Sequence, residues 1–261
     1  MFKILEVIHR YFLHLAYNGT NYHGWQLQNE LPTVQLSINN GLSLILRDEI
    51  NVVGCGRTDT GVHARNFYAH FDCVHKMDKQ SLQQLEFKLN RFLDKDIAIY
   101  KIWEVHPKAH ARFDAASRTY KYYVSNLKDP FKDDFTYYQY GDLDIEKMNK
   151  AAERLFDFID FTSFSKLHTQ TKTNDCKIYK AEWEQDGHSL VFTIQADRFL
   201  RNMVRAVVGT LIEVGRDQLS ITEFIQAIEA KDRSEAGYSV PAKALFLEDV
   251  IYPQEIVKSY K

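Results

Sequence analysis

Apolar and polar residues alternate along some segments of this chain and recur at helical spacing along others. Alternation predicts half-buried strands, and apolar residues three or four apart predict amphipathic helices. The elements expected in the first part of the chain are strands at 11–17, 52–53, 67–73 and 97–103 and helices at 34–45 and 82–89. Their order is β-α-β-β-α-β, as in a ferredoxin-like unit.

The second part of the chain repeats this order. The expected elements are strands at 118–125, 177–184, 189–197 and 245–252 and helices at 145–155, 200–211 and 224–228. Asp186-Gly187, between two of these strands, is a strong hairpin signal. We therefore expect an α+β fold in which two ferredoxin-like halves, 1–105 and 106–261, join into one mostly antiparallel eight-stranded sheet with helices on one face. The cleft between the halves is the default place for a site.

Composition limits the class of protein. The chain is 45% hydrophobic and 26% charged, as is usual for a soluble globular protein. No apolar run is long enough to span a membrane. Three cysteines, far apart and odd in number, favour a reducing compartment over a disulfide framework. We expect a cytoplasmic protein without a membrane partner.

The formal net charge of −2 argues weakly against a dedicated nucleic-acid-binding protein, because such domains are often strongly basic. A cleft can still concentrate cations locally. Arg112-Phe113 and the segment 117–123 (SRTYKYY) place basic residues beside aromatic rings. Such interleaving suits base stacking and phosphate contact. It also suits an ordinary sheet face, because tyrosine is a favoured strand residue, and from these residues alone the sheet face is the favoured interpretation.

Residues 54–64, GCGRTDTGVHA, combine three glycines with an arginine and an acid two residues apart, Arg57 and Asp59. Asp59 stands where a dinucleotide-binding fingerprint would have its third glycine. The chain has no phosphate-binding Gly-Lys-Ser/Thr loop and no HExxH or GxSxG motif. Its histidines and cysteines lack paired ligand spacing, so no metal site is expected.

A second candidate lies in the apolar helix that begins near Phe199. Arg201 and Arg205 are four residues apart and flank its apolar stripe. A partly buried guanidinium needs a carboxylate or phosphate partner. Either Arg205 forms an ordinary structural ion pair, or it meets an acid from the other half of the chain, for which Asp59 is the obvious candidate.

The chain as a whole resembles the tRNA pseudouridine synthase A family. Residues 54–64 are similar to that family's signature around its nucleophilic aspartate. The similarity extends, in the family's order, through YNGTNYHGWQLQ (17–28), TVQ (33–35), HARFDAASRTYKY (110–122), DFTSF (160–164), MVRAVVGTLIEVG (203–215), AKDR (230–233) and PAKALFLEDVIYP (241–253).

The resemblance implies a role for each matching residue. Asp59 matches the catalytic aspartate, Arg57 the arginine before it, Tyr120 the active-site tyrosine, Arg205 the basic partner of the aspartate, and Leu245 an apolar residue of the uracil pocket. The family's members are cofactor-free homodimers, without a metal, that act on the anticodon stem-loop of tRNA at uridines 38, 39 and 40. Departures from the family pattern stand at Asn18, Leu27, Asp94, 157–159 and Ala244.

Two other classes of function remain possible from the residues. A non-catalytic RNA-binding module of two ferredoxin-like halves would explain the sheet, the aromatic residues and the arginines, but not Asp59 in its turn. A small-molecule enzyme would explain an ion pair of Asp59 with Arg205, but not the basic and aromatic strands. Release of tritium from tRNA labelled at uridine C5 separates the isomerase from both.

Overall fold

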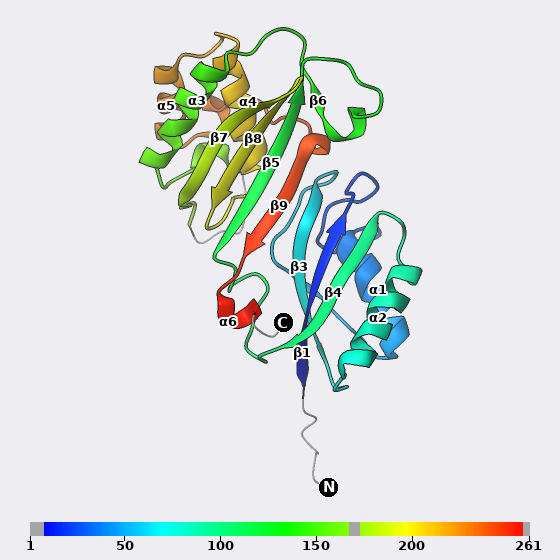
Figure 1. Ribbon diagram of the computed structural model, residues 1–261. Helices are drawn as coiled ribbons and strands as arrows, with labels where there is room; N and C mark the ends of the chain where they lie inside the picture. Colours follow the sequence, from blue (N-terminus) through cyan, green and yellow to red (C-terminus); the bar gives the residue numbers. More distant parts are fainter. Residues whose placement is uncertain (1–7, 167–172, 258–261) are drawn as a thin grey trace. The chain divides into compact units, whose positions relative to one another are not determined.

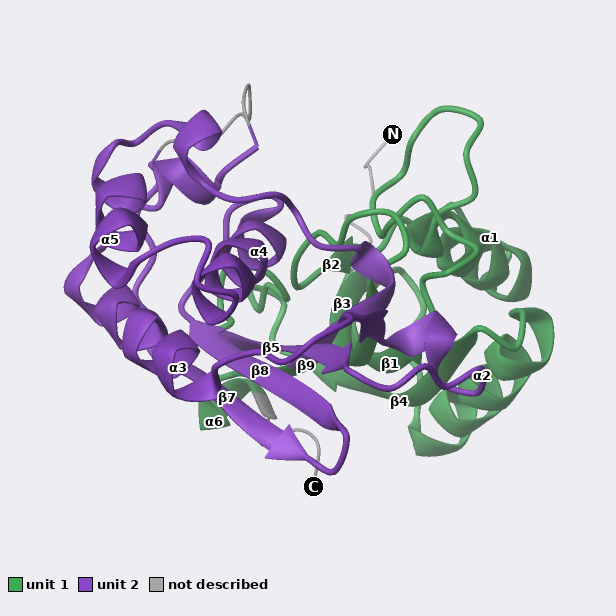
Figure 2. Ribbon diagram, turned by 90° about the horizontal axis from the view of Figure 1, so that it is seen from above, with its two compact units in different colours: residues 1–116, 249–261 green, residues 117–248 purple. Residues whose placement is uncertain are grey.

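The computed structural model describes residues 8–166 and 173–257. The chain has an α+β fold, and its strands form a mixed, mostly antiparallel sheet. It divides into two compact units, shown in separate colours in Figure 2. Unit 1 contains residues 1–116 and 249–261, and unit 2 contains residues 117–248. Each unit is described by itself below.

Unit 1 has the element order β-α-β-β-α-β. Its elements are β1 (His9–Tyr17), α1 (Val34–Leu46), β2 (Val53–Gly54), β3 (His63–Cys73), α2 (Lys79–Phe92), β4 (Ile97–Val105) and the short helix α6 (Gln254–Val257). Strand β1 pairs antiparallel with both β3 and β4, and β2 pairs antiparallel with β3. The hydrogen-bonded order is therefore β4-β1-β3-β2.

Helices α1 and α2 of unit 1 each begin directly after a residue whose side chain caps the helix N-terminus. The side chain of Thr33 accepts a hydrogen bond from Leu36 N at the start of α1, and that of Asp78 accepts one from Ser81 N at the start of α2. Helices α1 and α2 lie together on one side of the unit's strands (Figure 1). A Cβ on Gly41 of α1 would lie 2.7 Å from the Leu89 side chain of α2, so glycine lets the two helices pack closely.

Unit 2 begins with the long strand β5. Its elements are β5 (Ser117–Ser125), β6 (Tyr137–Tyr138), α3 (Ile145–Glu153), β7 (Ile178–Asp186), β8 (Ser189–Ala196), α4 (Met203–Gly215) and α5 (Ile221–Glu229). Strand β8 pairs antiparallel with β5 and β7, and β6 runs parallel to β5. Strand β9 (Leu245–Ile251) crosses the boundary between the units.

The three helices of unit 2 gather on one side of its strands (Figure 1). Helix α4 is the most apolar of them, and eleven of its residues are buried. Ser220 and Glu223 form a reciprocal capping box at the start of α5. The β7–β8 hairpin turns at Gly187, whose φ of 59° is typical of the turns that join such strands. The predicted hairpin is confirmed.

The structure corrects the predicted number of strands. The sheet has nine strands rather than eight, because β6 adds a two-residue parallel strand beside the end of β5. Two residues are too few to show an alternating pattern, so the sequence carried no signal for it. Helix α4 also begins at Met203, later than the predicted start at Leu200, and Asn202 precedes it with a φ of 68°.

The predicted halves divide after residue 105, within a link expected at 105–116, and unit 1 extends to the end of that segment. Residues 106–116 belong to unit 1 because several hydrogen bonds tie them there. Ala111 N donates to His70 Nδ1 at 3.1 Å, and Tyr252 Oη donates to the Ala111 carbonyl at 2.5 Å. Ala116 N also donates to a carbonyl of β9. The ferredoxin-like character of the two halves stays a prediction.

Candidate active site

A closed turn carries Asp59. The Asp59 carbonyl accepts a hydrogen bond from Val62 N at 3.1 Å. Gly61, the third residue of this four-residue turn, has a φ of 78°. A type II turn requires a positive φ at that position, and glycine adopts it without steric cost. The carboxylate therefore projects from the first residue of a well-defined turn.

The loop 18–25 packs its backbone directly onto this turn. A Cβ on Gly24 would lie 2.4 Å from the Thr58 carbonyl oxygen, and one on Gly19 would lie 2.0 Å from the Val62 carbonyl oxygen. Trp25 N donates to the Thr58 carbonyl at 3.3 Å. Both glycines are required for this backbone contact, because any side chain would occupy the space of a carbonyl group.

Two buried side chains fix the turn and the loop to the sheet of unit 1. The Thr58 hydroxyl shares a 2.8 Å hydrogen bond with Tyr17 Oη, and Thr58 is buried. His63 of β3, which is 1% exposed, accepts a hydrogen bond at Nδ1 from Gly19 N at 3.0 Å. On either side of Thr58, Arg57 is exposed and Asp59 is half-buried. Thr58 is thus the inward anchor between two charged side chains that reach solvent.

Tyr120 lies in the middle of β5, paired in register with Ile194 of β8. Its side chain is half-buried, and its ring meets the edge of the Phe199 ring at a centroid distance of 5.1 Å. Two residues along, Tyr122 is fully buried and donates its hydroxyl to the Pro241 carbonyl at 2.9 Å. Burial raises the pKa of the Tyr122 hydroxyl. Of the two tyrosines, Tyr120 has the ring that a ligand can reach.

Arg205 lies in helix α4, and a hydrogen bond also fixes its side chain. Its Nε donates to the Val240 carbonyl at 2.7 Å, and its own carbonyl accepts a hydrogen bond from Val240 N at 3.2 Å. Residues 236–241, which we call the strap, therefore run along α4. Val240 of the strap bonds to Arg205 twice, through its carbonyl and through its N–H group. This pair of bonds sets the direction of the guanidinium group.

The strap approaches α4 closely because α4 has a glycine there. A Cβ on Gly209 would lie 1.9 Å from the Tyr238 carbonyl oxygen of the strap. Gly237 N donates to Thr210 Oγ1 at 3.0 Å. Ser239 Oγ accepts from two neighbours. They are Asn202 Nδ2 at 2.7 Å and Arg233 at 2.9 Å.

Leu245 lies just beyond the C-terminal end of the strap. It is 5% exposed, begins β9 and is preceded by a short helical turn at Ala242–Ala244. Ala244, one of the departures from the family pattern, is fully buried. Leu27, another departure, is 40% exposed. Asn18 uses its side-chain carbonyl to accept hydrogen bonds from Thr20 N and Oγ1 within the loop 18–25.

The five predicted site residues fall into two groups. Arg57 and Asp59 lie in unit 1, on one turn. Tyr120, Arg205 and Leu245 lie in unit 2, on β5, α4 and the start of β9. Within unit 2, Val240 near the C-terminal end of the strap bonds to Arg205, and the chain reaches Leu245 five residues later, after the short helical turn Ala242–Ala244. The pairing of Asp59 with Arg205 stays a prediction.

Sequence reasoning missed the residues that support this group. It did not identify Val240 as the partner of the Arg205 side chain, or His63 as the anchor of the loop 18–25. One signal was present in the sequence: an isolated glycine inside an apolar helix, here Gly209, usually has a packing reason. The partner segment could not be read from the chain, because the strap has neither helical nor strand periodicity.

The described residues hold no cluster of three or more histidine, cysteine or acidic side chains that could bind a metal ion. The buried Cys176 is a poor nucleophile, because burial raises the pKa of its thiol to about 12. Among the residues that the structure describes, no helix has the length and apolar character needed to cross a membrane.

Comparisons with known proteins identify the family of the chain. A family model described as tRNA pseudouridine synthase matches residues 151–253, which include Arg205, the strap and Leu245. The chain is similar over nearly its whole length to curated proteins named tRNA pseudouridine synthase A. The protein from Parabacteroides distasonis is 59% identical over 95% of this chain and 97% of its own length.

Two further relatives span a wide range of identity. The protein of the same name from Bacteroides thetaiotaomicron is 54% identical over 95% of this chain and 92% of its own length. That from Clostridium acetobutylicum is 38% identical over 92% of this chain and 98% of its own length. The matched part of the family model includes helix α4 and lies after the Asp59 turn in the chain.

Proposed function

The chain belongs to the tRNA pseudouridine synthase A family and is an isomerase, and from this premise we propose that it converts uridine to pseudouridine at positions 38, 39 and 40 of the tRNA anticodon stem-loop, with Asp59 as the catalytic group. The observation that carries the proposal is the Asp59 turn. Gly19 and Gly24 of the loop 18–25 let that loop pack its backbone onto the turn, and the two charged side chains of the turn reach solvent on either side of a buried threonine.

The reaction needs a carboxylate and no redox group. The bond between uracil N1 and ribose C1′ breaks, the base turns, and a bond forms between C5 and C1′. C5 loses its hydrogen as a proton and N1 gains one, so atoms and electrons balance without an oxidant. A carboxylate can attack C1′, promote elimination to a glycal, or add to uracil C6. Asp59 supplies the carboxylate for any of these routes.

In this proposal Arg205 is the cationic partner of the Asp59 carboxylate. The strap supports this role, since its bonds to Arg205 fix the guanidinium direction. Arg57 contacts a phosphate or the displaced RNA strand, which its exposure allows. The glycines of the turn let its backbone approach a flipped nucleotide.

The base is held by the two remaining residues. Tyr120 stacks on the target uracil, and its hydroxyl handles a proton after the new carbon–carbon bond forms. Its half-buried ring, propped on edge by Phe199, supports this role. Leu245, buried just beyond the end of the strap, lines the uracil pocket. The β-α-β-β-α-β order of unit 1 supports two ferredoxin-like halves around the site.

The substrate is larger than one chain can hold by charge alone. With a formal net charge of −2, one copy offers little excess cationic surface, so a symmetric homodimer builds the tRNA-binding surface from both copies. Sedimentation at assay concentrations tests this assembly. A monomer that still modifies tRNA contradicts it.

Tritium release tests the proposed function. The protein is incubated with tRNA labelled with tritium at uridine C5, and released tritium is counted, since C5 loses that hydrogen when it joins C1′. The matched control is the same tRNA with cytidine at 38, 39 and 40, and single-uridine transcripts rank the three positions. We expect release from the parent tRNA and none from the control. Equal release from both would place the target outside the anticodon stem-loop.

A further inference from the structure

The loop 106–114, between β4 and β5, presents a phenylalanine to solvent. Phe113 is 75% exposed. The His110 ring lies behind it at a centroid distance of 4.2 Å, and the Arg112 guanidinium carbon lies 5.9 Å from the centre of its ring. An exposed ring on a mobile loop would need no explanation. This one stands on a rigid support.

Every backbone N–H from Ala109 to Asp114 donates a hydrogen bond. Ala109 N bonds to the His106 carbonyl and Asp114 N to the His110 carbonyl. His110 Nδ1 accepts from both Arg112 N and Phe113 N, at 3.1 and 3.3 Å. His110 N donates to Asp114 Oδ2 at 2.7 Å. The conformation at the tip is therefore fixed by the loop itself.

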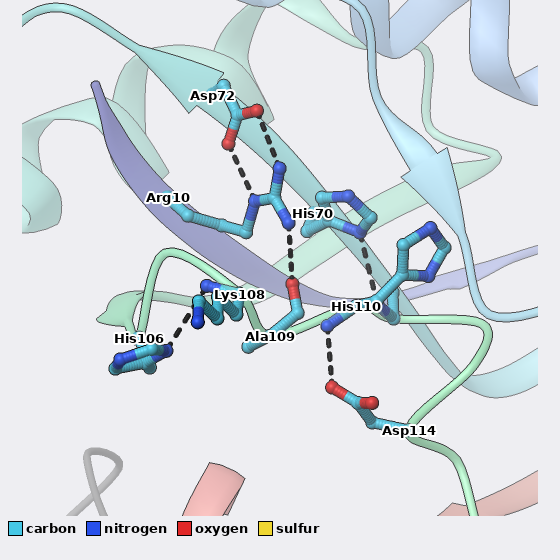
Figure 3. A network of polar contacts seen from close by, with 9 residues as sticks. Arg10, His70, Asp72, His106, Lys108, Ala109, His110 and Asp114 are labelled. Carbon is cyan, nitrogen blue, oxygen red and sulfur yellow. Dashed lines mark hydrogen bonds and ion pairs between the residues drawn. The ribbon is translucent and has the colours of Figure 1, made fainter.

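The base of the loop is tied to β1 and β3, as Figure 3 shows. His70, which is 4% exposed, accepts from Ala111 N at 3.1 Å. Arg10 donates to both carboxylate oxygens of Asp72 at 2.7 Å and to the Ala109 carbonyl at 2.9 Å. The His70 and His110 rings meet at 4.7 Å. The buried His70 and the ion pair of Arg10 with Asp72 thus support a loop that exposes the apolar ring of Phe113.

From this juxtaposition we infer that Phe113 and Arg112 form an RNA-contact site outside the catalytic residues, in which an unpaired base of the tRNA stacks on Phe113 and a neighbouring phosphate meets Arg112. A flat ring beside a guanidinium group complements a nucleotide, which offers a base face and an anionic phosphate. A ring fixed in advance loses little conformational entropy when it is covered. The inference rests on the proposed function, because it takes tRNA as the ligand.

The test measures tRNA affinity and turnover for Phe113→Ala, Phe113→Leu and Phe113→Tyr. Phe131→Ala is the matched control, because Phe131 is a phenylalanine of unit 2 that is 93% exposed. We expect Phe113→Ala and Phe113→Leu to weaken binding about tenfold, with unchanged turnover at saturating tRNA and an unchanged melting temperature. Phe113→Tyr and Phe131→Ala should bind as the parent does. Arg112→Ala should reduce the slope of log Kd against log salt concentration by about 1.

Each other outcome overturns the inference. Parent-like affinity in Phe113→Leu would show that an aromatic face is not used. Equal losses in Phe113→Ala and Phe131→Ala would show that any exposed ring behaves alike. Dissociation of a dimer by Phe113→Ala would assign the ring to a second copy of the chain. Failure of the proposed function is separate, because then the unaltered protein releases no tritium from tRNA.

Discussion

Two loops of unit 1 depend on buried histidine acceptors, whereas most of the side-chain hydrogen bonds to the strap of unit 2 come from arginine and asparagine donors. In unit 1, His63 and His70 are buried on β3 and accept hydrogen bonds from backbone N–H groups of two loops. In unit 2, Arg205, Arg233 and Asn202 donate hydrogen bonds to the strap. An imidazole nitrogen accepts only while it is deprotonated, whereas arginine donates at any physiological pH. The anchoring of unit 1 is therefore sensitive to acid in a way that the strap is not.

A second difference concerns what carries the proposed catalytic groups. Asp59 sits on a turn that is fixed by the backbone of another loop, packed against Gly19 and Gly24. Arg205 sits on a buried helix, and the irregular strap is fitted to it at Gly209. Changes at glycine should consequently act on the catalytic residue itself in unit 1, and on its support in unit 2.

The largest effect on the free energy of unfolding is expected for Gly24→Ala. The new Cβ would lie 2.4 Å from the Thr58 carbonyl oxygen, at a position whose φ is 84°. Steric overlap and backbone strain together should lower the free energy of unfolding by about 4 kcal/mol and remove most of the activity. Gly56→Ala is the matched control in the same stretch, because nothing lies within 4 Å of its Cβ. Similar melting temperatures for the two variants would show that the loop yields easily.

Acid should distinguish the two modes of anchoring. Burial and the nearby Arg10 and His110 lower the pKa of His70 to about 4, while the carboxylates of Asp72 and Asp114 raise it less. An unfolded histidine titrates near 6.5, so the unfolded state binds the extra proton first. The stabilisation is complete above pH 6.5 and is lost as pH falls toward 4, by up to about 3 kcal/mol for this group.

The measurement is the free energy of unfolding against pH for the parent, His70→Asn and His188→Gln. An asparagine carbonyl can still accept from Ala111 N without titrating in this range, so His70→Asn should flatten the slope between pH 6.5 and 4. His188 is exposed in the β7–β8 turn, and His188→Gln should keep the parent slope. An unchanged slope in His70→Asn would refute the acid sensitivity ascribed to this anchor.

Gly209→Ala should act more weakly, and through the strap. The new Cβ would lie 1.9 Å from the Tyr238 carbonyl, so the strap must move. Overlap costs about 2–3 kcal/mol, and about 1 kcal/mol is recovered because alanine favours a helix, leaving a net loss of about 1–2 kcal/mol. Turnover should fall more than tRNA affinity, since Arg205 loses its fixed direction. Parent-like turnover would mean that the strap does not position Arg205.

The smallest effect is expected for Tyr120→Phe. The ring and its edge contact with Phe199 remain, so tRNA binding should be unchanged. Loss of the hydroxyl should slow turnover about fivefold to tenfold, because water can partly replace it in proton handling. Tyr120→Ala should weaken binding as well. Turnover at the parent rate in Tyr120→Phe would leave the hydroxyl without a role.

The sequence predicted regular elements well and their supports poorly. Apolar periodicity located β1, α1 and the β7–β8 hairpin, because buried faces impose a repeat of 3.6 or 2 residues. Strand β6 and the strap impose no such repeat of apolar residues, so the sequence did not predict them. Gly19, Gly24 and Gly209 can be read from the sequence, but the carbonyl groups they face come from segments far along the chain. Such contacts are set by tertiary packing, which a local pattern does not record.

The central claim is that Asp59 supplies the catalytic carboxylate. Asp59→Asn keeps the size and most of the hydrogen bonding of the side chain and removes its negative charge. The measurement is tritium release from C5-labelled tRNA by folded Asp59→Asn, with tRNA binding measured in parallel. We predict that release falls by about a thousandfold or more, while binding stays within about tenfold, or about 1.4 kcal/mol. Release at a sizeable fraction of the parent rate would contradict the assignment of Asp59 as the catalytic group.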